Sequence, residues 1–432
     1  MFGYYLHLAW QRCRHHWASS CLVALTLAIG IAACMTTLTL VDTFAGAPIP
    51  GVSNHLYVTT LTPTTDTAPD SQLAWPLALA ILHARRADTQ AALAQTRPRV
   101  SDADGRHGTV TSGLLASGRI LATLGIALRF GRAWTQRELD AHAPVALIDT
   151  HLAERLFGAD DVVGRSITLN KRRFRVIGVT VPWQPRMRFS DVEQAVPGPL
   201  GRPVRIILPI GAALAAGVGP LSAGACGNGG PADTAFGTVK LHGCAWLELW
   251  TRLDTPAARA GYVRFLRHFA QARQHHGYFA KPMHAALYGT RAWMDLNAMT
   301  PDGVALNALL AGAFLLLCMS QVVGLVTARF LDGRAHAAIR RALGATRGQI
   351  LAQHLVESTL LGAGGGLVAL PLTLLGLWIV RAQPVGYAAA AQCHWDMFVL
   401  LLIVALAAGA LVGAWPAWRV GRQPPARCIK QG

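Results

Sequence analysis

Residues 18–40 of this chain read ASSCLVALTLAIGIAACMTTLTL, and no Asp, Glu, Lys or Arg lies between Arg14 and Asp42. A helix needs roughly 20 mostly apolar residues to cross a hydrocarbon core about 30 Å thick. A charged side chain at mid-bilayer costs at least ~2.5 kcal/mol, which explains why the stretch is uncharged. The stretch therefore predicts a membrane-spanning helix over 18–42. Because its apolar run exceeds the ~7–15 residues of a signal peptide, we favour a retained anchor over a cleaved leader.

Three further windows have the same character, at residues 304–328, 358–380 and 397–418, and the window at 358–380 predicts a helix over 355–380. The composition agrees, because 52% of the 432 residues are hydrophobic and only 14% are charged. A soluble domain usually carries roughly 25% charged residues. The sequence predicts a membrane protein with four transmembrane α-helices and a large α+β extracytoplasmic domain, residues 43–303, inserted between helices 1 and 2.

Basic residues in short segments predict the orientation, because Lys and Arg are retained on the cytoplasmic side. The N-terminal stub at 1–17 carries Arg12 and Arg14, whereas the loop at 381–396 carries only Arg381 and Asp396. The loop at 329–354 and the tail at 419–432 are also basic, through Arg329, Arg334, Arg340, Arg341, Arg347, Arg419, Arg422, Arg427 and Lys430. Both termini are therefore expected in the cytoplasm, and the domain at 43–303 outside it.

The net charge of +17 and the pI near 10.3 raise the question of nucleic-acid binding. The arginines are scattered, and the sequence has no dense basic run interleaved with aromatic residues. A nucleic-acid interface normally shows such a footprint. We therefore expect the lipid bilayer, and not nucleic acid, as the charged partner.

The extracytoplasmic domain shows mixed patterns. Alternation predicts strands at 55–61, 108–117 and 245–252 and a hairpin over 166–181 around Asn170–Lys171–Arg172. Helical spacing predicts helices at 76–95, 150–157 and 257–274, with Thr150 as N-cap and Gly158 as C-cap of the second. Residues 182–244 are rich in Pro and Gly and are expected to be an irregular insert.

Enzyme and metal chemistry are not indicated. The sequence contains no G-x-x-x-x-G-K-[ST] phosphate loop, no H-E-x-x-H and no C-x-x-C. The sixteen histidines include the adjacent pairs His15–His16 and His275–His276, but neighbours on a helix do not face one site. We expect no catalytic group, no metal site and no cofactor in this chain.

Three cysteines fall in the outward segments, at Cys226, Cys244 and Cys393. Cys226 and Cys244 bracket a Gly/Pro-rich stretch in an oxidising compartment, where disulfides form and persist. A Cys226–Cys244 bridge is expected.

The segment between the second and third spans predicts a helix over 339–353. Arg340, Arg341 and Arg347 fall on its polar faces, and Ile339, Leu343 and Ile350 on its apolar side. A basic amphipathic helix resting on anionic headgroups is one reading of this pattern. Glu357, at the start of the third span, is placed to cap that helix N-terminus.

Glycines cluster inside the third span, at Gly362, Gly364, Gly365 and Gly366. No Lys-Ser/Thr follows them, so they do not form a phosphate loop. Gly362 and Gly366 have the small-x-x-x-small spacing that allows helices to approach closely in a membrane. The cluster is expected to pack helix on helix.

Three stretches resemble the MacB/FtsX-like family of ABC transporter permeases, the mechanotransmission type. They are TLGIALRFGRAWTQRE at 123–138, PVALIDTHLAERLFGADDVVGRSITLNKRRFRVIGV at 144–179 and AHAAIRRALGATRGQILAQHLVE at 335–357. The second and third are the more specific. The order of one span, a large external domain and three spans is also similar to that family.

The resemblance implies a permease subunit of the bacterial inner membrane that couples ATP hydrolysis to movement of its periplasmic domain. ATP and Mg²⁺ would be bound by a dimer of separate ATPase subunits, and the permease would form a homodimer or a heterodimer with a similar permease. A periplasmic adaptor and an outer-membrane channel are further implied partners. The role would be export or extraction of a periplasmic peptide, lipoprotein or drug. The alternative is a non-transporting, FtsX-like regulator of a periplasmic hydrolase.

The resemblance also implies a coupling helix that docks on the ATPase, with Gly344 and Ala345 permitting close approach. His336 stands where the family usually has glutamate. The residues implied in coupling are His336, Ile339, Arg340, Arg341, Ala342, Leu343, Gly344, Ala345 and Glu357.

Overall fold

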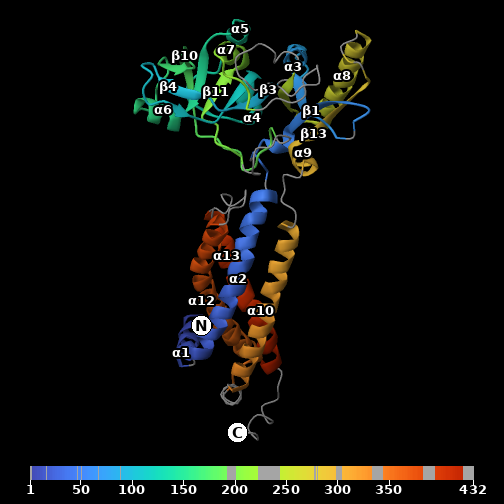
Figure 1. Ribbon diagram of the computed structural model, residues 1–432. Coiled ribbons are helices and arrows are strands. Elements are labelled where there is room, and N and C mark those ends of the chain that lie inside the picture. The colour runs from blue at the N-terminus through green and yellow to red at the C-terminus, as the bar shows by residue number, and fades with distance from the viewer. Residues whose placement is uncertain are drawn as a thin grey trace. The chain divides into compact units, whose positions relative to one another are not determined.

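The computed structural model describes residues 2–15, 17–45, 47–49, 51–66, 68–87, 89–191, 201–221, 244–276, 279, 281–297, 304–332, 344–382 and 395–421. The chain divides into two compact units. The helical unit combines Met1–Ala45 with Pro301–Gly432, and the sheet unit is Gly46–Thr300. Figure 1 labels their elements.

The helical unit contains a short helix and four long ones among its described residues. They are α1 (Phe2–His15), α2 (Trp17–Ala45), α10 (Val304–Asp332), α12 (Arg347–Ala382) and α13 (Trp395–Gly421). Each long helix contains a stretch of sufficient length and hydropathy to cross a membrane, at Trp17–Asp42, Leu306–Ala328, Gly348–Ala382 and Met397–Ala414. The four spans predicted from the sequence are confirmed, and α12 begins before the predicted third span.

The four long helices form a bundle (Figure 1) and share a small core. Helix α12 contacts α13 and α2, and α10 contacts α2 and α13. Leu27 and Ile31 of α2 are fully buried in one cluster with Val322 of α10 and Ala405 of α13. Large apolar side chains on the outer faces, such as Leu316, remain exposed because lipid tails solvate them as well as protein does.

The described part of the sheet unit forms one 13-stranded mixed sheet, ordered β13-β1-β12-β3-β6-β11-β8-β10-β9-β4-β5, with β2 paired to β12 and β7 to β10. Most pairs are antiparallel, but β6–β11 and β8–β10 are parallel. The strands are β1 (Leu56–Pro63), β2 (Gln72–Ala74), β3 (Thr89–Thr96), β4 (Arg99–Asp102), β5 (Thr109–Val110), β6 (Gly113–Gly118), β7 (Leu128–Gly131), β8 (Val145–Asp149), β9 (Ser166–Leu169), β10 (Arg172–Thr180), β11 (Ile206–Pro209), β12 (Ala245–Arg252) and β13 (Met283–Gly289).

The described helices of this unit accompany the sheet (Figure 1). They are α3 (Trp75–His83), α4 (Ile120–Leu124), α5 (Gln136–Asp140), α6 (Thr150–Phe157), α7 (Ile210–Ala215), α8 (Pro256–His275) and α9 (Thr290–Leu296), with a 3-10 turn at Ser53–His55. Of these, α3, α6, α7 and α8 supply buried residues to the core. Leu115, Phe174 and Leu249 are fully buried in the resulting core. The predicted α+β architecture between the first two spans is confirmed.

The helix predicted over 76–95 is wrong in its second half. Helix α3 ends at His83, Arg85 adopts a positive φ of 47°, and β3 begins at Thr89. Alanine favours helices, but β3 pairs with β12 on one side and β6 on the other. Ala91, Ala92 and Leu93 are consequently all buried. Tertiary pairing has overridden local propensity.

The stretch expected to be an irregular insert also contains regular structure. Strand β11 lies between β6 and β8, and α7 follows it directly. The four residues of β11, IILP, are all buried. A four-residue apolar run among prolines and glycines has no periodicity to reveal a strand, so the sequence pattern missed it.

Asp149 joins three of these elements. Its Oδ1 accepts a hydrogen bond from the Leu152 backbone N–H (2.8 Å). Its Oδ2 forms an ion pair with Arg205 Nη1 (3.0 Å). It is therefore the N-cap of α6, and the prediction of Thr150 as N-cap is wrong by one residue. The predicted C-cap is confirmed, because Gly158 ends the helix at φ 66°.

The motif at 123–138 is a structural one. Arg132 forms a two-pronged ion pair with Glu138 (2.6 and 2.8 Å), and Glu138 also accepts from the Thr135 backbone N–H (2.7 Å). Thr135 and Glu138 form a capping box at the start of α5. Gly131, at φ 76°, lies so close to Ile177 that a Cβ would collide with its carbonyl oxygen. These residues fix a turn beside β10.

The substitution Glu138→Gln tests how much the Arg132–Glu138 ion pair stabilises this turn, through the pH dependence of unfolding. The hydrogen bond from Arg132 lowers the pKa of Glu138 from 4.5 to about 2. A depressed folded-state pKa stabilises the fold above pH ~4.5, and this contribution is lost as pH falls towards 2. Because Arg132 is 55% exposed, we expect only about 1 kcal/mol near neutral pH. The measurement is thermal unfolding in detergent between pH 7 and 3, where the difference between wild type and variant should shrink.

Glu154→Gln provides the control, because this exposed carboxylate on α6 forms no ion pair within the described residues. The difference in unfolding temperature between wild type and Glu154→Gln should stay nearly constant between pH 7 and 3. Parallel pH curves for wild type and Glu138→Gln would contradict the prediction.

Candidate functional site

Only part of the implied coupling segment lies within the described residues. His336, Ile339, Arg340, Arg341, Ala342 and Leu343 lie outside them. Gly344, Ala345 and Glu357 lie within them, and Gly344 is exposed. Their surroundings define the candidate site, which is the start of α12 and the part of α1 that contacts it.

A sharp break precedes α12. Gly344 has a φ of 99°, a conformation that residues other than glycine rarely adopt, so the helix predicted over 339–353 does not include residues 344–346, and its part at 339–343 lies outside the described residues. The Thr346 backbone N–H donates to Gln349 Oε1 (3.0 Å), and the Gln349 N–H donates to Thr346 Oγ1 (3.3 Å). This reciprocal capping starts α12 at Arg347, from where it runs to Ala382.

Glu357 is buried and contacts α1. Its side-chain Oε2 lies 3.4 Å from Arg12 Nη1 and 3.9 Å from His354 Nδ1. Its exposed fraction is 1%, so the carboxylate is almost wholly removed from water. The expectation that Glu357 caps a helix N-terminus is wrong, because α12 begins about three turns earlier. The ion pair instead fastens α1 to α12.

The glycine cluster of α12 divides between two neighbours. A Cβ on Gly362 would lie 2.6 Å from Ala405 O and 2.8 Å from Gly409 Cα of α13, and one on Gly366 would meet Ala405 Cβ. A Cβ on Gly365 would meet α2 at Leu27. Gly364 has nothing within 4 Å, so its predicted packing role is wrong within the described residues. The reason is angular, because each helical residue turns by about 100°.

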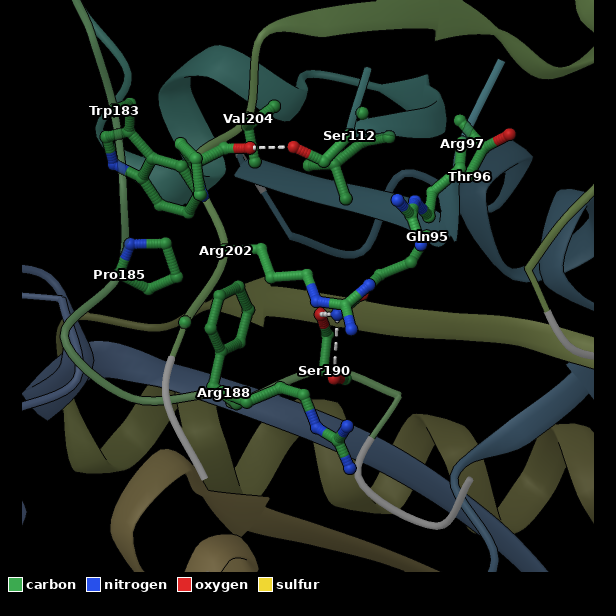
Figure 2. Close-up of a pocket in the computed structure, with 15 residues that line it drawn as sticks. Gln95, Thr96, Arg97, Ser112, Trp183, Pro185, Arg188, Ser190, Arg202 and Val204 are labelled. Atoms are coloured by element: carbon green, nitrogen blue, oxygen red, sulfur yellow. Dashed lines mark hydrogen bonds between the residues drawn. The ribbon is translucent and has the colours of Figure 1, made fainter. Parts of the chain in front are cut away.

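The sheet unit has a pocket beside Gln95, Arg188 and Ser190 (Figure 2). Gln95 Nε2 donates to Ser190 O across it (3.1 Å). Burial lowers the pKa of Arg188, while nearby Asp191 and Glu248 favour its charged form. The volume is about 20 Å³, enough for one or two water molecules. This pocket is too small for a peptide or a drug.

Two further expectations concern side-chain chemistry. Among the described residues, no group of three or more His, Cys, Asp or Glu is placed to hold a metal ion. Cys244 is buried and disulfide-bonded. Cys226 lies outside the described residues, so its pairing with Cys244 stays a prediction.

Two family models match this chain. The first, described as a MacB-like periplasmic core domain, matches residues 20–218, and the second, an FtsX-like permease C-terminal domain, matches residues 308–425. The chain belongs to the MacB/FtsX-like family of ABC permeases. The first match includes β11 and α7, which places them in the core domain of this permease. With four apolar helices and this core domain, the permease is a membrane protein with an extracytoplasmic domain.

Curated relatives are similar to the permease at low identity. The macrolide export ATP-binding/permease protein MacB of Bdellovibrio bacteriovorus is 22% identical, over 70% of this chain and 41% of its own length. The pyoverdine export ATP-binding/permease protein PvdT of Pseudomonas aeruginosa is 24% identical, over 69% and 39%. The permease thus spans about two fifths of these relatives. A solved periplasmic region of MacB from Actinobacillus actinomycetemcomitans has 14% identity and a TM-score of 0.35, over 56% of this chain and 92% of that one.

Sequence reasoning missed the pairing of Arg12 with Glu357. The two residues lie 345 positions apart, so no spacing rule links them. A signal was nevertheless present, because Glu357 is the sole acidic residue of α12 and an acid in such a helix calls for a basic partner. Arg12 and Arg14 are the only basic residues of the N-terminal stub apart from histidines.

Gly362→Ala tests the contact of α12 with α13. Its Cβ would lie closer to α13 than a van der Waals contact allows, so we expect a loss of about 1–3 kcal/mol. Gly364→Ala is the matched control, two residues away on an open face, and should be neutral or stabilising by up to ~1 kcal/mol. The measurement is thermal unfolding in detergent. Equal effects of the two substitutions would contradict the assignment.

Arg12→Ala tests the buried ion pair. Removing the cation leaves the Glu357 carboxylate buried beside His354, and we expect destabilisation by about 1–3 kcal/mol. Adding Glu357→Gln should recover part of this loss, which a double-mutant cycle measures as coupling. Arg14→Ala, which removes an exposed arginine from the same turn, is the control. Strictly additive effects would show that the pair contributes nothing.

Proposed function

We propose that this chain is the transmembrane subunit of an ABC transporter, in which a dimer of separate ATPase subunits drives movement of the extracytoplasmic domain. The work is export or extraction of a periplasmic peptide, lipoprotein or drug. The chain sits in the bacterial inner membrane with both termini in the cytoplasm, and pairs with a second copy or a similar permease. An adaptor and an outer-membrane channel complete the path. ATP and Mg²⁺ are bound by the ATPase.

The observation that carries this proposal is the construction of α12. The helix starts at a defined cap beside exposed Gly344 and runs to Ala382, with Pro371 in its second half. Force applied by an ATPase near Gly344 and Ala345 would therefore move the part of α12 that precedes Pro371 as a rod, and this part carries Glu357 and the glycine contacts. The buried Arg12–Glu357 pair and the glycine contacts would pass that movement to α1, α13 and α2.

Helix α2 offers the path to the extracytoplasmic domain. It is 29 residues long, contains no proline, and ends at Ala45, where the helical unit gives way to the sheet unit along the chain. An α-helix without proline or a break is stiff over this length. Displacement of α2 along its axis would thus reach the sheet unit covalently.

The match to a MacB-like core domain over residues 20–218 favours export, because the similar proteins MacB and PvdT are named as export proteins. The FtsX-like match favours the alternative, a regulator that signals to a periplasmic hydrolase. Affinity capture from membranes separates the two roles. An outer-membrane channel or adaptor supports export, and a cell-wall hydrolase supports regulation.

Ala345→Trp tests the coupling assignment. Ala345 follows the exposed glycine break, so a large side chain there should block close approach of an ATPase while α12 keeps its cap. We expect the permease to fold normally but to lose at least tenfold in ATPase association, measured by co-purification. Stimulated ATP turnover in proteoliposomes should fall with it.

Thr346→Val is the matched control, because it removes the cap hydroxyl without adding bulk. It should lower thermal stability and leave ATPase association largely intact. Unchanged association and turnover in Ala345→Trp would overturn the coupling site, and equal losses in both variants would assign the effect to helix damage.

A further inference from the structure

A concave groove on the sheet unit runs along α8 and has no role in the proposed coupling. It lies between the first half of α8 and the segment around His55 and Tyr57 at the start of β1. Its volume is about 690 Å³, within the range of roughly 300–1,000 Å³ typical of ligand sites. This groove is thus large enough to hold a segment of polypeptide.

Three arginines of α8 line the groove, namely Arg259, Arg264 and Arg267. All three are exposed, and their spacings of five and three residues place them within an arc of about 140° around the helix. Helix α8 contains no acidic residue. Within the described residues none of the three arginines forms a salt bridge, although Arg259 lies over the Tyr57 ring at 5.2 Å.

The acid at the rim does not neutralise this charge. Asp254 Oδ1 lies 3.2 Å from Arg252 Nε and 3.7 Å from His55 Nδ1. Arg252 is the last residue of β12 and His55 lies in the 3-10 turn before β1, so neither partner belongs to α8. The arginine stripe therefore presents unneutralised positive charge to the groove.

Helix α8 is held rigidly beneath the stripe. Thr255 caps its N-terminus by accepting from the Ala258 N–H (3.1 Å). On the side that packs against the sheet, Tyr262 and Leu266 are fully buried, and Tyr262 donates to Gln90 Oε1 (3.0 Å). Val263 and Leu253 add apolar surface to the groove between the charges. The guanidinium groups are thus carried on a fixed scaffold, which lowers the ordering cost of binding.

We propose that this groove binds an extended acidic segment of a partner polypeptide, with carboxylates on the arginines and apolar side chains on Val263 and Leu253. Arginine suits carboxylates because its fork makes two parallel hydrogen bonds. Arg259 and Arg267 are separated along the helix by about 12 Å, since each residue rises 1.5 Å. Carboxylates four residues apart in an extended chain are separated by about 13 Å. The match in spacing, together with the concave shape, favours a peptide over a membrane surface.

The groove is lined only by residues of the sheet unit, so binding there is tested independently of the coupling site. The probe is a fluorescein-labelled twelve-residue peptide with glutamates four residues apart and Ala and Leu between them. Its binding to the full chain in neutral detergent is followed by fluorescence anisotropy. We expect saturable binding, weakened at least tenfold when the glutamates are replaced by glutamines, and weakened by salt.

The double substitution Arg264→Gln/Arg267→Gln should weaken binding of the acidic peptide at least tenfold. Arg172→Gln/Arg173→Gln removes the same charge from exposed positions of the hairpin at β10 and should change it less than twofold. Equal losses in the two variants would overturn the proposal, because the binding would then reflect net charge. Equal binding of the glutamine peptide would also overturn it.

A competition experiment separates the two sources of negative charge. Short-chain phosphatidylglycerol is added to the peptide complex, with phosphatidylcholine in parallel. Persistence of the complex at concentrations of lipid well above that of the unlabelled peptide supports a polypeptide partner. Displacement by phosphatidylglycerol at the same concentration as unlabelled peptide would assign the groove to lipid headgroups and overturn the proposal.

Discussion

Direct contact between Gly362 of α12 and Gly409 of α13 sets the geometry of the helical unit. Inside a bilayer, apolar side chains gain little by leaving lipid for protein, so helices associate through close packing. Glycines let two backbones approach and multiply the short-range attractions between them. Gly365 extends the same principle to α2, and Gly30 of α2 extends it to Cys318 of α10. Small residues thus organise all four long helices.

A second constraint comes from charge in an apolar setting. A buried carboxylate is costly unless it is paired, and Glu357 meets this need through Arg12 of a helix at the other end of the sequence. The pair makes the position of α1 depend on that of α12. In the sheet unit Asp149 plays a comparable part by joining β8, α6 and the residue before β11. In both places one buried acid connects segments distant in sequence.

The sequence predicted what depends on local pattern and failed where pairing decides. The four spans were placed within a few residues of the observed helices, apart from the early start of α12, because long apolar runs have one solution in a bilayer. The hairpin of β9 and β10 was also predicted from its local pattern. In the structure Asn170 and Lys171 take the positive φ values that a two-residue turn needs. Strand β3 and the Arg12–Glu357 pair were missed, because an alanine-rich strand and a distant ion pair are defined by partners that the local sequence does not reveal.

The length of α12 determines where its charged end lies. Thirty-six helical residues extend about 54 Å, whereas a hydrocarbon core is about 30 Å thick. Tilt alone would have to exceed 50° to hide this excess, beyond the range of about 0–40° found for membrane helices. Arg381 in the last turn fixes the opposite end at an interface, so the surplus turns emerge near Arg347. Glu357 therefore lies at the level of the headgroup layer, although its carboxylate is buried by protein, and about three turns of α12 project beyond it.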